Sequence, residues 1–323
     1  MRKLLIAAVA LLAGVASAHA QSYPTRQITA VVPASAGGPT DTIARIVMAR
    51  VQQTLGQSVI IENIGGASGT IATGRVVRAE PDGYTLIIGG VNHFVVNGAV
   101  YPLNYDLLKD FAPIAMLASG PMLILSRKSL PATNLQEFLV WLRQNPENVT
   151  YGTGGLASPP HITGLSLQEI THNKFQFVPF RGSAPALQQV LAGQLDMIID
   201  QASAALSIAR DGGARVYAVT AAQRLESAPE IPTVDEAGLP GFHVSIWQGL
   251  FAPKGTPKEI IAKINAAVVE ALADPTVQKR LKDVGQELPS HEQQTPEGFG
   301  AYHKAEVEKW WPIIKAANIK PAG

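Results

Sequence analysis

Residues 28–56, ITAVVPASAGGPTDTIARIVMARVQQTLG, predict one strand, one turn and one helix in that order. Ile28–Pro33 is short, apolar and rich in β-branched residues, as a buried strand is. The turn residues Ala36–Thr40 follow, and apolar residues then recur at helical spacing from Ile43 until Gly56 ends the helix. This unit is the building block of α/β folds.

The same order recurs along the chain, which predicts βαβ units and a mainly parallel sheet. Further strands are expected at 58–63, 85–88, 113–117, 122–126, 149–152, 175–179, 197–200, 216–220 and 244–252. Helices are expected at 70–79, 160–171, 184–191, 257–273, 275–284 and 296–317. A helix after 133 is opened by the capping box Thr133–Gln136, and Thr256–Glu259, Asp274-Pro275 and Thr295-Pro296 are further helix starts.

The chain is expected to leave a first lobe and later return to it. The strands at 113–117 and 122–126 lead out, and the strand at 244–252 leads back after a long loop at 221–241. We therefore expect lobe 1 to comprise residues 21–120 and 248–323, and lobe 2 to comprise residues 121–247. Two connecting segments between lobes form a hinge.

The first twenty residues predict a secretory signal peptide. Arg2 and Lys3 precede the apolar stretch Leu4–Val15, and small residues end the segment at Ala18–Ala20. That stretch is shorter than the roughly 20 residues of a membrane span. The mature chain would begin at Gln21 and work in the periplasm as a freely diffusing monomer.

Composition removes several function classes. The chain has no cysteine, so it has no disulfide, thiol nucleophile or thiolate metal site. It carries 26 basic and 25 acidic residues without long runs of one sign, which disfavours nucleic acid or direct membrane insertion as its task.

A search for catalytic motifs also disfavours an enzyme. There is no Gly-x-Ser-x-Gly elbow, and His291-Glu292 lacks the second histidine of a zinc protease motif. Gly152–Ala157 fits a dinucleotide fingerprint, but no acidic residue ends a strand about 20 residues later. We expect no catalytic residue, metal or cofactor.

The glycine turns suggest anion binding instead. A turn that leads from a strand into a helix presents free backbone N–H groups and the positive end of the helix dipole. The chain has one such turn per expected lobe, at Ala36–Thr40 and Gly152–Ser158, with Gly66–Gly69 as a helper. Turns at the carboxyl ends of strands in two facing lobes would hold a small carboxylate.

These residues resemble the Bug-type (TctC) periplasmic receptors of tripartite tricarboxylate transporters across almost the whole mature chain. The resemblance rests on the order and spacing of Val31–Pro33 with Gly37–Asp41, Glu62–Asn63 with Gly65–Gly69, Pro81–Tyr84, Tyr151-Gly152, Pro179–Gly182, Ile231–Val234 and Trp247–Pro253. The chain departs from the family pattern at Phe94, Pro159-Pro160 and Arg181.

The resemblance implies a type II periplasmic-binding-protein fold of two Rossmann-like lobes that close on the ligand. Together with the glycine turns it gives the expected ligand-binding residues Ala36, Gly37, Gly38, Thr40, Gly66, Ser68, Asn97, Thr153, Gly154, Ala157, Ser158, Arg181, Asp200 and Trp247. A structural role is an open alternative for Arg181 as a surface residue, for Asp200 as a helix cap and for Trp247 as a core residue. The residues of the two turns, 37–40 and 153–158, could likewise serve only as structural turns.

The resulting expectation is a solute-binding protein for a dicarboxylate, an acidic amino acid or a related acid. It would hand its ligand to integral membrane transporter subunits. The alternatives are a ligand-sensing component of a signalling system and a secreted hydrolase.

Overall fold

The computed structural model describes residues 23–180 and 182–316, and the expected signal peptide lies outside them. The strands are β1 (Ile28–Val32), β2 (Val59–Asn63), β3 (Thr85–Gly90), β4 (Phe111–Ser126), β5 (Thr150–Thr153), β6 (Gln176–Pro179), β7 (Met197–Gln201), β8 (Arg215–Val219) and β9 (Ser245–Pro253). The helices are α2 (Pro39–Leu55), η1 (Ala67–Gly69), α3 (Thr70–Val77), η2 (Asn92–Val96), α4 (Asn97–Val100), α5 (Leu135–Gln144), α6 (Pro159–Thr171), α7 (Ser183–Leu191), α8 (Ala202–Arg210), α9 (Lys258–Ala273), α10 (Pro275–Asp283) and α11 (Pro296–Ala316).

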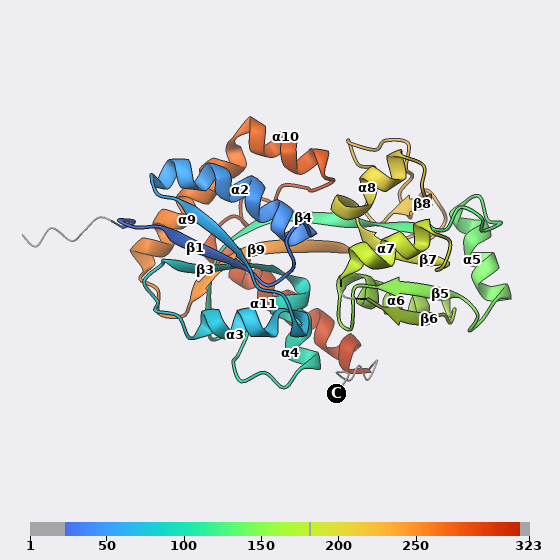
Figure 1. Cartoon of the computed structure of the whole chain (residues 1–323), viewed down its shortest axis with the longest axis horizontal. Helices are drawn as coiled ribbons and strands as arrows, with labels where there is room; N and C mark the ends of the chain where they lie inside the picture. The colour runs from blue at the N-terminus through green and yellow to red at the C-terminus, as the bar shows by residue number, and fades with distance from the viewer. Residues whose placement is uncertain (1–22, 181, 317–323) are drawn as a thin grey trace, which may run out of the picture.

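One sheet runs through the molecule in the order β2-β1-β3-β9-β4-β7-β5-β6, and β8 pairs with β4 beside this path (Figure 1). The pairs at its two ends are parallel, as expected. The expectation of a mainly parallel sheet is nevertheless wrong at the centre, because β9 and β4 run antiparallel to each other and to the strands on either side. The fold is therefore α/β with a mixed sheet.

The strand β4 is longer than the sequence indicated. We expected two strands, at 113–117 and 122–126, but residues 111–126 form one strand. Up to Pro121 this strand pairs with β9, and from Met122 onward it pairs with β7 and β8. The partner strands therefore change between Pro121 and Met122, which is where the two lobes meet.

We call the first lobe the elements β1–β3, β9, α2–α4 and α9–α11 with residues 111–121 of β4. The second lobe is β5–β8 and α5–α8 with residues 122–126 of β4. Figure 1 shows the two lobes side by side, joined by β4 and β9. The chain crosses between them twice along the sheet, as expected for a hinge.

Alternating side chains cover both faces of the first-lobe sheet. Ile28, Ala30 and Val32 pack in the core under α2 and α9, whereas Val31 joins the core on the opposite face, which contains η2 and α11. This alternation follows from the two-residue period of a strand. It fixes the strand ends, and with them the turns that follow.

Two of the expected helix caps differ from the structure. The box at the start of α5 lies one residue later, because Asn134 accepts from the amide of Glu137 and the Glu137 carboxylate accepts from Thr133. At α9 the N-cap is Pro257, and the Thr256 hydroxyl donates to Pro253 instead of capping. Each helix still begins within one residue of its expected position.

Candidate functional site

The first glycine corner joins β1 to α2. Gly37 has φ +80°, which favours glycine, and Gly38 caps α2 without any side-chain hydrogen bond. The Asp41 carboxylate accepts from the Gly37 amide at 2.8 Å and from Arg45 Nε at 3.0 Å. Among the described residues, no partner takes the amides of Thr40 and Asp41. These amides can therefore donate to an anion at the helix N-terminus.

The Asp41 carboxylate organises this corner from within. Burial alone would raise its pKa, but the hydrogen bonds from Arg45, Gly37 and Asn63 lower the pKa of Asp41 overall. Asp41 therefore stays ionised, with its charge balanced by Arg45. Its side chain stabilises the turn and leaves the helix N-terminus free for a ligand.

The second corner, Gly66–Gly69, bends the chain after β2. All four residues have positive φ, including Ala67 at +45° and Ser68 at +52°. Strained residues of this kind persist only where the surrounding structure holds them, and they concentrate at functional sites. Asn97 Nδ2 donates to the Ser68 carbonyl at 2.9 Å and so fixes the corner from α4.

The third corner, in the second lobe, joins β5 to α6. Gly155 and Ala157 have φ of +106° and +63°, and the amide of Gly155 donates to Thr153 Oγ1 at 3.3 Å. The Ala157 amide donates to His161 Nδ1, so this imidazole ring accepts at Nδ1. Pro159-Pro160 occupies the first turn of α6, and proline has no N–H. The donors left for a ligand therefore lie mainly in the turn itself.

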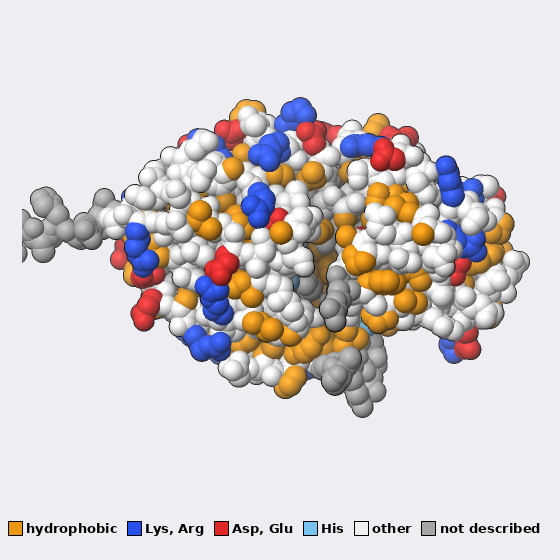
Figure 2. Space-filling view, viewed as in Figure 1, with side chains coloured by type: hydrophobic (Ala, Val, Ile, Leu, Met, Phe, Trp, Pro, Cys, Tyr) orange, Lys and Arg blue, Asp and Glu red, His pale blue; other side chains and the backbone are white. Residues whose placement is uncertain are grey.

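The two lobes touch between the second and third corners. Ser68 Oγ lies 3.4 Å from the Leu156 carbonyl oxygen and 2.8 Å from the Tyr101 hydroxyl. Figure 2 shows a furrow between the lobes on the face where these segments meet. The corner Gly66–Gly69 of the first lobe therefore meets the corner of the second lobe.

Several buried polar side-chain atoms have no hydrogen-bond partner in the described part of the chain. They include Asn97 Oδ1, Ser158 Oγ and Gln248 Nε2, whose residues lie in or contact the corners, and Asp200 Oδ2 and Gln201 Oε1 at the end of β7. An unpartnered buried polar group costs about 1–3 kcal/mol. Such groups, supplied by both lobes, are what a polar ligand would satisfy.

Asp200 is the penultimate residue of β7 in the second lobe. Its side chain is buried, and Oδ1 accepts from the Gln201 amide at 2.9 Å. Burial raises the pKa of Asp200 from 3.8 to about 7. Asp200 does not cap the following helix, which was its alternative role, because Gln201 is the N-cap residue of α8 and no side chain makes a capping hydrogen bond there. Asp200 can accept from an ammonium or hydroxyl group, or donate when it is protonated.

Two expected residues stand apart from this arrangement. The Trp247 side chain is 0% exposed, and Nε1 donates to Glu306 Oε2 at 3.3 Å among the rings of Phe251 and Phe299. The structure thus places Trp247 in the core, the alternative left open by the sequence. Arg181 lies outside the described residues.

Sequence reasoning missed Gln248 and His93. Gln248 Oε1 accepts from Thr40 Oγ1 at 3.1 Å at the first corner. A buried glutamine inside the apolar run Ile246–Ala252 was the signal that could have found it. His93 is buried between Gly69 and Pro33, and burial lowers its pKa to about 4. His93 is therefore neutral and supports the corner by packing.

Residues 23–180 and 182–316 contain neither a candidate metal site nor a candidate membrane span. No group of three or more potential metal ligands is found there, and no helix in this range is long and apolar enough to cross a membrane.

Several solved structures resemble this chain in its two-lobed fold. MatC of Rhodopseudomonas palustris with bound malate is 41% identical with a TM-score of 0.83, over 90% of this chain and all of that one. A second R. palustris protein, solved with adipate, is 35% identical with a TM-score of 0.86, over 93% and 100%. The periplasmic binding protein BugD is 35% identical with a TM-score of 0.84, over 92% and 99%. The fold defines a two-lobed periplasmic binding protein.

Sequence comparison narrows this class. The UPF0065 protein of the ttuE-ttuC' intergenic region of Agrobacterium vitis is 37% identical over 92% of this chain and 86% of that protein. A family model described as "Tripartite tricarboxylate transporter family receptor" matches residues 43–319. The chain belongs to this family of receptors.

Proposed function

We propose that this protein captures a small carboxylate between its lobes and delivers it to a tripartite tricarboxylate-type membrane transporter. The observation that carries the proposal is the contact of Ser68 with Leu156, which brings the glycine corners of both lobes together. The amides of Thr40 and Asp41 lie on the first-lobe side, and the turn Gly154–Ser158 lies on the second-lobe side.

Recognition rests on backbone donors. Amide N–H groups at a helix N-terminus bind a carboxylate without a cationic side chain. The described first-lobe corner offers Arg45 as its near cation, and Asp41 already neutralises that charge. A ligand with two carboxylates would place one at each lobe and contact both sets of donors only when the lobes are closed.

The ligand class follows from the donors and from the relatives. Malate and adipate, the ligands in two similar structures, are both dicarboxylates. Asp200 adds an acceptor at the second lobe, which suits a ligand that also carries a hydroxyl or ammonium group. We therefore propose a dicarboxylate, hydroxy dicarboxylate or acidic amino acid.

Closure supplies the output signal. A ligand that contacts both lobes binds the closed state more tightly and shifts the hinge equilibrium towards it. We propose that the membrane subunits recognise the surface of the closed state. We also propose that the protein acts in the periplasm as a monomer after removal of residues 1–20. Ligand capture would then make and break no covalent bond. Lobe boundaries at 120/121 and 247/248 are consistent with the change of partner strands near Pro121.

A thermal-shift and calorimetry panel tests the proposal. Malate, succinate, adipate, citrate, aspartate and glutamate are compared with succinamide, which has the length of succinate without its charge. A ligand at 100 times its Kd should stabilise the fold by about 2.7 kcal/mol. No stabilisation by any acid, or equal stabilisation by succinamide, would reject carboxylate capture. Uptake by proteoliposomes that contain the membrane subunits would then separate transport from sensing.

A further inference from the structure

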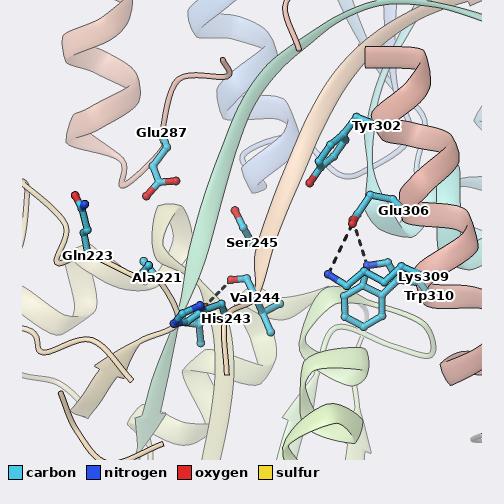
Figure 3. Close-up of a pocket in the computed structure, with 12 residues that line it drawn as sticks. Ala221, Gln223, His243, Val244, Ser245, Glu287, Tyr302, Glu306, Lys309 and Trp310 are labelled. Atoms are coloured by element: carbon cyan, nitrogen blue, oxygen red, sulfur yellow. Dashed lines mark hydrogen bonds and ion pairs between the residues drawn. The ribbon is translucent and has the colours of Figure 1, made fainter. Parts of the chain in front are cut away.

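A second cavity lies at the hinge, with a volume of about 470 Å³. Its walls come from both lobes: the segment Thr220–Gln223 after β8, the start of β9, Glu287 after α10, and the side of α11 that carries Tyr302, Glu306, Lys309 and Trp310 (Figure 3). The Ser119 and Glu287 backbones pair beside it, close to the point where β4 changes partners.

This cavity is distinct from the carboxylate cleft. Side chains alternate along a strand, so Ser245 and Trp247 of β9 point to one face and Gln248 points to the other. Gln248 contacts Thr40 at the first glycine corner, whereas Trp247 contacts Glu306 of α11. The cavity lined by Ser245 and Glu306 therefore lies on the opposite face of the sheet from the cleft.

The cavity has an excess of acceptors. Figure 3 shows the Glu287 carboxylate, the Tyr302 hydroxyl and the Ser245 hydroxyl directed towards its middle. In the described part of the chain, the Glu287 carboxylate is exposed at the rim of the cavity and has neither an ion pair nor a hydrogen bond. A carboxylate in this setting gains from a cationic partner.

Glu306 gives the cavity a fixed second carboxylate. Its side chain is 8% exposed, and Oε2 accepts from the indole N–H groups of Trp247 and Trp310 at 3.3 and 3.2 Å. Oε1 lies 3.9 Å from Lys309 Nζ, which is beyond hydrogen-bonding distance. Lys309 itself is 58% exposed and lies over the Trp310 ring. Two acidic groups therefore face one solvated lysine.

From this geometry we propose that the hinge cavity binds a small organic amine in its protonated form. The ammonium group contacts Glu287 and the Ser245 and Tyr302 hydroxyls, and its carbon chain lies against Trp310. Charged hydrogen bonds and contact with aromatic faces are the interactions that retain ammonium groups.

The test is calorimetric titration of the full mature chain with 1,4-diaminobutane, agmatine and ethanolamine at constant ionic strength. We expect saturable binding of at least one amine, and Glu287→Gln should weaken it at least about tenfold. Glu308→Gln is the matched control, because it removes one charge from an exposed position of α11 that lies outside the cavity. It should leave amine binding unchanged.

Three results would overturn the proposal: no amine binds the wild-type chain, Glu287→Gln binds the amine as tightly as wild type, or both variants weaken binding equally. The melting temperature of each ligand-free variant shows whether it is folded. Because amine binding is measured without any acid, the outcome is independent of whether the cleft binds a carboxylate.

Discussion

Ser68 in the first lobe donates its hydroxyl hydrogen to the carbonyl oxygen of Leu156 in the second lobe, with 3.4 Å between the oxygens. A carbonyl oxygen can only accept, so the nearby Tyr101 hydroxyl, at 2.8 Å, must be the donor to Ser68. The backbone of Ser68 has φ +52°, a conformation held by its neighbours. A strained corner thus supplies a direct side-chain bond between the lobes.

Replacement of Ser68 by alanine should loosen the closed state. The variant loses the hydrogen bond between the lobes, which contributes about 0.5–1.5 kcal/mol, so carboxylate affinity should fall roughly threefold to tenfold. Small-angle scattering should show a larger radius of gyration for the ligand-free variant. Tyr101→Phe keeps the contact of Ser68 with Leu156 and should have a smaller effect. Equal effects of the two substitutions would contradict the role of Ser68.

Substitution of Gly69 by alanine should disrupt the second corner. Gly69 has φ +85°, and a Cβ atom would lie 2.5 Å from His93 Cδ2 and 2.8 Å from the Pro33 oxygen. We expect a loss of more than about 2 kcal/mol in the free energy of unfolding. Gly56→Ala is the control, since φ is +67° but the space is open, and it should cost about 1 kcal/mol. Urea denaturation measures both, and similar losses would argue against the close packing at Gly69.

The Gln248 side chain should raise the affinity for the carboxylate and contribute little to the free energy of unfolding. Replacement by the similarly sized methionine removes the unpartnered Nε2, which favours folding, and also the hydrogen bond that Oε1 accepts from Thr40, which disfavours it. Because these two effects oppose each other, the free energy of unfolding should change by less than about 1 kcal/mol. Carboxylate affinity should fall about tenfold.

Gln294→Met is the matched control. This buried glutamine donates to the Pro289 carbonyl, so its replacement should lower stability and leave binding unchanged. Unchanged affinity in Gln248→Met would remove Gln248 from the site.

Asp200 should make stability depend on pH. Its pKa is about 7 in the folded protein and near 3.8 when exposed, so the folded state binds more protons between these values. Stability on this account falls as pH rises through that window, by up to about 4 kcal/mol, and is constant above it.

The difference in unfolding free energy between Asp200→Asn and wild type should therefore increase from pH 4.5 to pH 7.5. Asp211→Asn, an exposed change, should show no such trend. A difference for Asp200→Asn that does not vary with pH would show that Asp200 is not held in a protonated form by burial.

Local patterns of the sequence predicted most of the fold. Several strands and turns of the first lobe follow from periodicity and glycine, as in β1, Gly37 and α2. The continuous β4 and the antiparallel centre were not predictable, because the local pattern indicates two separate strands, at 113–117 and 122–126, and does not show which strands pair. The pairing in the sheet shows that β9 stops pairing with β4 at Pro121, while β4 itself continues beyond that residue.

The candidate site was predictable where it depends on backbone geometry. Gly37, Gly66 and Ser68 lie in turns whose backbone has positive φ values. Glycine-rich segments of the sequence indicate such turns. Trp247 and Gln248 are adjacent in one strand, and the sequence does not show which face of that strand meets the cleft. The missing knowledge was tertiary: α11 covers the Trp247 face, and Thr40 meets Gln248 on the other.

A crystal structure of the mature protein with malate tests the central claim most directly. We predict that one carboxylate lies within about 2.7–3.2 Å of the amides of Thr40 and Asp41, and that the other groups of the ligand reach the turn Gly154–Ser158. Malate bound outside the lobes, or held mainly by lysine and arginine side chains, would contradict recognition by backbone amides at opposed glycine corners.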